Sequence, residues 1–379
     1  HRRCTMNAAA AFQKIADGVR GTEWTATLEV ISGFDVAVLV RRVSRTSQTT
    51  SNQPDSGSAR DTDSGNCVMK SLDNPHDDAG HSLRPYSPMG VQTGLAGTAT
   101  ASVPSQSTVS PSTQSFGDLA TVRAMGTGES APVIGFDTEF TYQDDGSRVI
   151  DSYQFSVFDP EDASVLVNVT LIPLRPLRVA FADALAVVIL ESGLWRTVGL
   201  RDPRGLPRRD FWVDGDYRAS VEALYKQNGV AVTVAGHYLN ADLTTFAQPA
   251  KRRGGERYED ILRRVTSASG GLVSLKPVRM IARSGSGSGA RWLPLSITIR
   301  DTMGQSAPGQ KSLANLGDVC NRTKLEVGDA IENMTAYLEH HLLNFLEYGA
   351  NDADIVLEYL TALWGTNATP PVTLSGGGA

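Results

Sequence analysis

The sequence predicts an α/β protein in which a mixed β-sheet is flanked by helices. Three strand-like runs follow one another at 133–141, 149–158 and 164–172, and beyond them helix-like and strand-like segments alternate. Consecutive strands joined by short turns pair antiparallel, whereas strands separated by helices pair parallel, so the two patterns together predict a mixed sheet. The chain has 379 residues, of which 41% are hydrophobic, which suits one large domain with extensions or two average domains.

The N-terminal third divides into a short structured segment and a long tract of unusual composition. Residues 1–43 form a small segment of unknown role, with a predicted helix at 8–19 and one strand-like run at 25–40. From 44 to 130 the chain is rich in Ser, Thr, Gly, Pro, Asp and Gln, and its apolar residues are sparse and without period. Such a tract cannot bury enough apolar surface to offset the entropy of ordering it, so we predict a disordered linker.

Regular patterns of apolar residues resume at 131 and continue to 368. We predict that residues 131–368 form one domain, followed by a flexible tail at 369–379. After the first three strands, apolar periodicity and turn residues predict four helices and two strands. The helices are expected at 177–194, 217–227, 312–320 and 347–364, and the strands at 230–235 and 293–300. A variable stretch at about 249–290, with a Gly- and Ser-rich run near its end, is interpreted as an insertion.

Charge, cysteine usage and hydropathy exclude some classes of protein. The net charge of −6 gives no overall sign of nucleic-acid binding, so local basic clusters matter more than the total. Cys4, Cys67 and Cys320 are far apart and lack metal-ligand spacing, which predicts reduced thiols and an intracellular location, cytoplasmic or nucleoid, with an organelle also compatible. No apolar run approaches the roughly 20 residues of a membrane span, so no membrane partner is expected.

The most informative motif ends the first strand of the predicted domain. An apolar run there leads into Asp137, Thr138 and Glu139. Side chains alternate along a strand, so the carboxylates of Asp137 and Glu139 share one face. Two carboxylates on a buried face repel each other and resist desolvation. A pair of divalent cations would compensate for both effects.

Two further acidic motifs lie downstream. Asp242 closes the segment Gly-His-Tyr-Leu-Asn-Ala-Asp directly after the strand at 230–235, a usual place for site residues in α/β folds. Tyr348 and Asp352 are four residues apart on a predicted helix and therefore share a face. Each motif also has an ordinary interpretation, since Asp242 suits a helix N-cap and the Tyr348–Asp352 pair suits a plain amphipathic helix.

Taken in order over about 131–365, the three motifs resemble the DEDD superfamily of 3′–5′ exonucleases, in its tyrosine-containing DEDDy subgroup. The resemblance implies a ribonuclease H-like fold and hydrolysis of phosphodiester bonds at single-stranded 3′ ends with two divalent cations, Mg²⁺ or Mn²⁺. It implies that Asp137 bridges both cations, that Glu139 and Asp352 bind the cation that activates water, and that Asp242 serves the other. Tyr348 would orient the attacking water.

The second motif departs from the family pattern, and a later stretch extends the resemblance. Tyr238 stands where many family members have Asn, and Ala241 where they have a large aromatic residue. A non-catalytic nucleic-acid-binding domain of the same fold is therefore the alternative.

The stretch 301–317 resembles exonuclease domains of protein-primed and organellar family B DNA polymerases. Because the chain begins with His1 rather than Met, it also fits a proofreading module with a polymerase or replication protein as its partner.

Single-stranded DNA or RNA is the expected substrate, and the sequence offers several residues that could contact it. An acidic protein that binds nucleic acid needs local positive charge, and aromatic side chains can stack on bases. Solvated loops, core packing and a packed histidine are the ordinary alternatives for these side chains. The candidates are Thr138, Phe140, His237, Arg208, Arg209 and Lys311.

Overall fold

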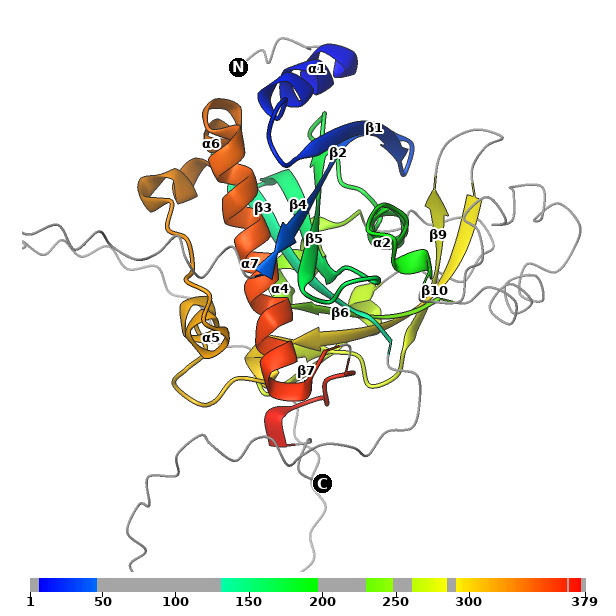
Figure 1. Ribbon diagram of the computed structural model, residues 1–379, viewed down its shortest axis with the longest axis vertical. Helices are drawn as coiled ribbons and strands as arrows, with labels where there is room; N and C mark the ends of the chain where they lie inside the picture. Colours follow the sequence, from blue (N-terminus) through cyan, green and yellow to red (C-terminus); the bar gives the residue numbers. More distant parts are fainter. Residues whose placement is uncertain are drawn as a thin grey trace, which may run out of the picture. The chain divides into compact units, whose positions relative to one another are not determined.

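The computed structural model describes residues 7–45, 131–196, 230–247, 261–284, 291–366 and 368–375 (Figure 1). Nearly all of the predicted linker at 44–130 lies outside the described residues, as does the predicted helix at 217–227. Of the predicted tail at 369–379, the structure describes residues 369–375.

Within the described residues, an eight-stranded mixed sheet forms the centre of the fold, in the order β1-β2-β5-β4-β3-β6-β10-β9. Its strands are β1 (Thr25–Ile31), β2 (Phe34–Ser44), β3 (Val133–Tyr142), β4 (Arg148–Phe158), β5 (Val165–Pro173), β6 (Val230–Gly236), β9 (Val278–Ser284) and β10 (Arg291–Asp301). Strands β3, β4 and β5 pair antiparallel, whereas β6 pairs parallel with both β3 and β10. The predicted α/β class and mixed sheet are confirmed.

The N-terminal segment belongs to this sheet. Strand β2 pairs antiparallel with β5, and β1 pairs with β2 in a tight hairpin. The prediction of a single strand at 25–40 was wrong, because Ser32 and Gly33 reverse the chain with φ angles of 55° and 89°. Positive φ at both central residues is what a two-residue hairpin turn requires, and glycine adopts it without strain.

Helices cover both faces of the sheet (Figure 1). They are α1 (Ala8–Gly18), α2 (Phe181–Glu191), α4 (Leu239–Asp242), α5 (Leu313–Cys320), α6 (Met334–His340) and α7 (Leu342–Trp364). The long helix α7 crosses β3 and β4 on one face, and it begins five residues before the predicted 347. No helix in the described part of the chain is both long and apolar enough to span a bilayer.

Glycine lets α7 lie directly on β3. A Cβ atom at Gly135 would collide with the carbonyl oxygen of Ala353, and one at Gly349 would collide with the side chain of Gln154. Glycine inside a strand usually marks such a close approach of another backbone. The contact at Gly135 fixes the height of α7 above the strand that carries Asp137.

Helix α2 lies on the opposite face and is buried on all sides, which explains why its sequence is apolar throughout. Its Asp183 is buried and accepts hydrogen bonds from the Ser32 hydroxyl at 2.8 Å and from the Arg283 backbone N–H at 2.6 Å. Ser32 lies in the β1–β2 turn and Arg283 lies in β9. One carboxylate therefore ties the two edge strands of the sheet to the same helix.

The stretch expected to be an insertion, 249–290, contains part of the main sheet. Its described residues form a 3₁₀ turn (Ile261–Arg263), a small hairpin of β7 (Thr266–Ala268) and β8 (Gly271–Val273), and the edge strand β9. Strand β9 pairs with β10 along its whole length. This stretch therefore completes the sheet rather than forming only an added loop.

Candidate metal centre

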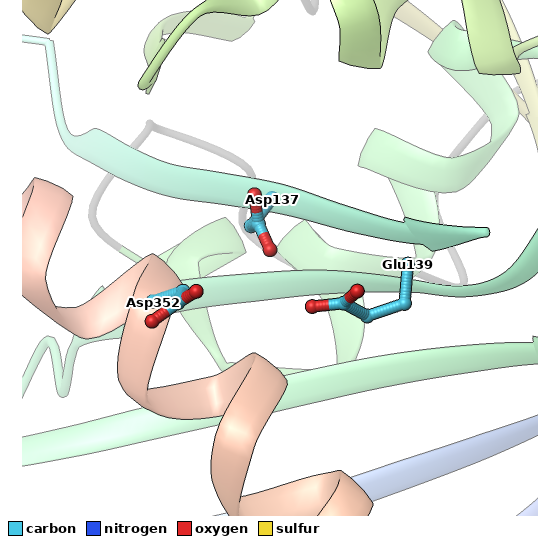
Figure 2. Close-up of side chains that lie close together, drawn as sticks. All are labelled: Asp137, Glu139 and Asp352. Atoms are coloured by element: carbon cyan, nitrogen blue, oxygen red, sulfur yellow. The ribbon is translucent and has the colours of Figure 1, made fainter. Parts of the chain in front are cut away.

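Three of the predicted acidic residues meet in space. Asp137 and Glu139 project from β3 toward α7, and Asp352 projects back from α7, so the three carboxylates point toward one another (Figure 2). One oxygen from each lies within 4.8 Å of the others. The strand alternation that predicted the first pair and the helix face that predicted Asp352 are both realised.

The backbone packing explains why these residues meet. Gly135 precedes Asp137 by two residues and contacts Ala353, which directly follows Asp352. The close approach of strand and helix at Gly135 therefore sets Asp352 opposite Asp137. In the pairing of β3 with β4, the register shifts by one residue between Glu139 and Phe140, just beyond the cluster.

The three carboxylates are unfavourably placed as negative charges, because they are buried and repel one another. Burial raises the pKa of Asp137 well above its ordinary value, and repulsion from Asp242, Glu139 and Asp352 raises it further. Burial and repulsion from Asp352 raise the pKa of Glu139 in the same way. Burial also raises the pKa of Asp352, to about 6, against the opposing effect of Lys324. A divalent cation bound among the three oxygens would remove this repulsion.

Lys324 is the residue that the sequence analysis missed. Its ammonium group lies 3.0 Å and 3.4 Å from the two oxygens of Asp352 and donates to the Tyr348 hydroxyl at 3.3 Å. The same group lies 4.7 Å from the centre of the Tyr348 ring, within the range of a cation–π contact. Lys324 is thus a positive charge held at the edge of the carboxylate cluster.

The loop that carries Lys324 is clamped to α7. Arg322 is buried and forms ion pairs with Asp354 at 3.1 Å and with Glu358 at 2.6 Å. Asn351 donates from its side-chain amide to the Thr323 carbonyl at 3.1 Å. Because these contacts come from the helix that also carries Asp352, Lys324 and its carboxylate partner are positioned by one element.

Asp242 lies near the cluster but is not part of it. It is buried in α4, and its carboxylate accepts a hydrogen bond of 2.7 Å from the Thr138 hydroxyl. Burial raises its pKa to about 7, an effect that the bond from Thr138 opposes, while Asp301 raises the pKa and Arg148 lowers it. Thr138 was predicted to contact nucleic acid, and in this structure its hydroxyl binds Asp242.

The segment that leads to Asp242 is held by Asp301, at the end of β10. The Asp301 carboxylate accepts backbone hydrogen bonds from Tyr238 at 3.0 Å, Leu239 at 2.9 Å and Leu272 at 3.0 Å. Tyr238 has a φ of 62°, in the left-handed region that Asn adopts more readily than Tyr. The backbone at Tyr238 is therefore strained, and Asp301 holds this turn in place.

Tyr348 lies at the cluster, as predicted. Its side chain is buried, and burial followed by repulsion from Asp352 raises its pKa, so the hydroxyl stays neutral. A neutral hydroxyl can donate to or accept from water beside the carboxylates.

The other predicted contact residues have ordinary surroundings. Phe140 packs edge-to-face on Tyr142, with ring centres 5.5 Å apart, and carries the Arg148 guanidinium 5.0 Å from its ring centre. The His237 ring bonds the Thr302 hydroxyl at 2.8 Å, and burial lowers the pKa of His237. Lys311 donates to the Ser269 carbonyl at 3.1 Å. Arg208 and Arg209 lie outside the described residues.

A cavity of about 900 Å³ lies between α1, α6 and the start of β4, and none of the three clustered carboxylates lines it. Asp151 and Thr335 line it, and Asp151 accepts hydrogen bonds from the Thr141 hydroxyl at 2.8 Å and the Thr335 hydroxyl at 2.6 Å. Asp151 also raises the pKa of Glu139 by repulsion. The volume lies within the range of small-molecule sites.

Comparison of the chain with protein-family models, with curated proteins and with solved structures found no match.

The donor set fits a hard divalent cation. Carboxylate oxygens are the ligands that Mg²⁺ and Mn²⁺ prefer, and three of them converge from two rigid elements. The raised pKa values show that the same oxygens are held together at a cost when no cation neutralises them. Asp137, Glu139 and Asp352 are therefore the residues that could hold a metal ion.

This electrostatic cost predicts a pH dependence of stability in EDTA. Asp352 and Asp242 have folded pKa values of about 6 and about 7 against an ordinary value of 3.8, so their protonation favours the folded state. Their contribution to stability is present below pH 3.8 and is lost as the pH rises through 6 and 7. We expect the melting temperature of Asp352→Asn, relative to the wild type, to rise from pH 4 to pH 7.

Thermal unfolding followed by circular dichroism measures this difference, because groups common to both proteins cancel. Addition of millimolar Mn²⁺ is expected to stabilise the wild type more than Asp352→Asn at pH 7. A difference between the two proteins that stays constant across this pH range would contradict the expectation.

Proposed function

We propose that the protein is a metal-dependent 3′–5′ exonuclease that hydrolyses phosphodiester bonds at single-stranded nucleic-acid ends. One observation carries the proposal: Asp137, Glu139 and Asp352, from a strand and a helix more than 200 residues apart in sequence, bring their oxygens within 4.8 Å. The order of the three motifs along the chain, which resembles that of DEDDy exonucleases, supports the same function.

The sheet supports a ribonuclease H-like fold. In the central order β5-β4-β3-β6-β10, the first three strands along the chain pair antiparallel and the next two extend the sheet in parallel. Helix α7 covers the face that carries the acidic pair. Strands β1, β2 and β9 then extend this five-stranded centre on both sides.

The residues around the cluster suit phosphoryl chemistry. A bound divalent cation would supply charge stabilisation for the phosphate and an activated water. Tyr348 can orient that water through its neutral hydroxyl, and Lys324 provides a positive charge beside Asp352 that would attract a phosphate oxygen. The exposed ring of Tyr142, three residues after Glu139 on the same strand, offers a stacking surface for a base.

Digestion of a 5′-labelled single strand tests the proposal. With Mg²⁺ or Mn²⁺, we expect a ladder of products that shortens from the 3′ end, and with EDTA we expect intact strands. DNA and RNA of the same sequence, run in parallel, identify the substrate. Strands that remain intact with both metals, from protein that unfolds cooperatively, would refute the exonuclease.

A non-catalytic nucleic-acid-binding domain is the second candidate, and the state of Asp242 favours it. Asp242 lies outside the group of three whose oxygens share one site, and one of its oxygens accepts a bond from Thr138. Binding of a labelled single strand without any cleavage would select this candidate over the exonuclease.

A further inference from the structure

We propose that Gln154 is a further positioning residue of the metal centre, whose side-chain amide oxygen accepts a hydrogen bond from a water molecule bound to the cation. The inference rests on the proposed metal centre and adds an uncharged acceptor to its three carboxylates. Three observations carry it: the place of Gln154 in the sheet, the position of its amide group, and an oxygen atom of that amide without a partner.

Gln154 lies beside the acidic pair, on the neighbouring strand. In the pairing of β3 with β4, Gln154 is directly opposite Asp137, and Ser152 is directly opposite Glu139. Side chains directly opposite one another in antiparallel strands share a face of the sheet, with Cβ atoms about 4.5–5.5 Å apart. The side chain of Gln154 therefore projects from the face that carries Asp137 and Glu139, one strand away from both.

Two contacts determine where the amide of Gln154 lies. Its Nε2 donates a hydrogen bond to the Ser152 hydroxyl oxygen, so the amide lies along β4, beside the acidic pair of β3. Helix α7 covers it, since a Cβ atom at Gly349 would lie 2.5–2.8 Å from Nε2, Cδ and Cγ of Gln154. Gly349 precedes Asp352 by three residues, nearly one turn of the helix. The amide is thus held between the strand pair and the helix turn that carry the three carboxylates.

The oxygen of this amide is an acceptor without a donor. Among the described residues, Oε1 of Gln154 has no hydrogen-bond partner. The residue is only 1% exposed, so bulk water does not satisfy this oxygen. Buried polar atoms nearly always have a partner, and a bound water or ion supplies it where protein groups do not. An unpaired acceptor one strand from three converging carboxylates is what a hydrated cation at that site would satisfy.

A water molecule, rather than the cation itself, suits the separation of the two strands. Asp137, Glu139 and Asp352 supply three protein oxygens, whereas Mg²⁺ and Mn²⁺ prefer six oxygen ligands and Mg²⁺ usually keeps several of them as water. Neighbouring strands lie about 4.7–4.9 Å apart, a distance that one bridging water can span. Because a cation makes its bound water a stronger hydrogen-bond donor, an acceptor fixed beside it should strengthen metal binding.

Titration of the full-length chain with Mn²⁺ at pH 8, without nucleic acid, tests the inference by calorimetry. Gln154→Met keeps the length of the side chain and removes the acceptor. We expect it to bind Mn²⁺ at least about tenfold more weakly than the wild type, the usual loss when a partner of a metal-bound group is removed. Gln154→Glu keeps an acceptor oxygen at the same place and is expected to bind Mn²⁺ at least as tightly as the wild type.

Thr170→Val is the matched control. Thr170 pairs with Gln154 from β5, is equally buried at 1% exposure, and has a hydroxyl oxygen without a partner among the described residues. It lies two strands from the acidic pair, so this variant is expected to bind Mn²⁺ like the wild type. Weakening as large as that in Gln154→Met would mean general damage beneath α7 and would overturn the inference.

Melting curves in EDTA establish that each variant is folded. Equal affinity for Mn²⁺ in the wild type and in folded Gln154→Met would overturn the inference. A tenfold loss in folded Gln154→Glu would do the same, because the acceptor oxygen would then not be the part of the side chain that matters. This second comparison decides the question even if Gln154→Met does not fold.

The result is also distinguishable from failure of the proposed function. If the wild type binds no Mn²⁺, the metal centre itself is refuted. If the wild type binds Mn²⁺ and digests single strands while Gln154→Met binds Mn²⁺ equally well, the exonuclease stands and only the role of Gln154 is lost.

Discussion

Replacement of Asp137 by asparagine is expected to lower the rate of strand digestion by at least about 10³-fold and, in EDTA at pH 7, to raise the melting temperature. The rate falls because Asp137 is at the centre of the cluster, and residues of such a unit cannot replace one another. The stability rises because Asp137 is repelled by Asp242, Glu139 and Asp352 when no cation is present. An uncharged amide of the same shape removes that repulsion.

The digestion rate is expected to fall while the melting temperature rises. These opposite changes distinguish a lost function from a damaged fold. For proteins of this size about 1 kcal/mol corresponds to about 2–4 °C, so a rise of a few degrees is measurable by calorimetry. Asp144→Asn, in the exposed turn between β3 and β4, is the matched control and should change neither quantity. A digestion rate within tenfold of the wild type would show that the carboxylate cluster is not the catalytic centre.

Removal of residues 1–45 is expected to abolish cooperative folding of the remaining chain. Strand β2 pairs with β5 over nine positions, from Val36 to Ser44, so its loss exposes a full strand edge in the sheet. The same segment supplies Val19, Trp24 and Leu39 to the apolar cluster beneath the start of α7. Without them, the helix that carries Asp352 loses much of its apolar support.

Buried charges add to this effect. Arg41 is buried, bonds Asn168 at 3.2 Å and pairs with Glu347, and Arg45 pairs with Glu358 at 2.9 Å. Truncation removes the partner of the buried Asn168 and one of the two cations that pair with the buried Glu358, which is costly inside a protein. Thermal unfolding and near-ultraviolet circular dichroism of residues 46–379 measure the result, with and without a peptide of residues 7–45. A truncated chain that melts cooperatively near the wild-type temperature would contradict the prediction.

The strands and the late helices could be predicted because each buries one face. Its apolar residues therefore recur with the period of a strand or of a helix. Strand β3 and helix α7 are examples, since the apolar residues before Asp137 and around Asp352 follow strand and helix periods. The split between β1 and β2 was missed although Ser32 and Gly33 were visible as turn residues, because apolar residues on both sides suggested one continuous strand. The joining of that hairpin to β5 depends on pairing across a large sequence separation, which no local pattern reports.

The proximity of the candidate side chains could be predicted where a repeating element carries them and was missed for Lys324, which a loop carries. Asp137, Glu139, Tyr348 and Asp352 lie on such elements, and the structure places all four together. Lys324 lies in an irregular stretch between α5 and α6, and its partner is 28 residues away, so its charge looked like any solvated lysine. The bond between Thr138 and Asp242 joins residues 104 positions apart and had no local signal.

The pairing of β2 with β5 also determines the order in which the protein can fold during synthesis. Ser44 pairs with Val165, 121 positions later, so the β1–β2 hairpin emerges from the ribosome long before its partner strand exists. At the usual elongation rates of about 5–20 residues per second, the wait lasts roughly 6–24 seconds. Val36 and Val38, fully buried in the finished sheet, have no β5 to pack beside during that time. Such a large sequence separation slows folding, and during the wait the hairpin exposes apolar side chains and an unpaired strand edge that can associate with other chains.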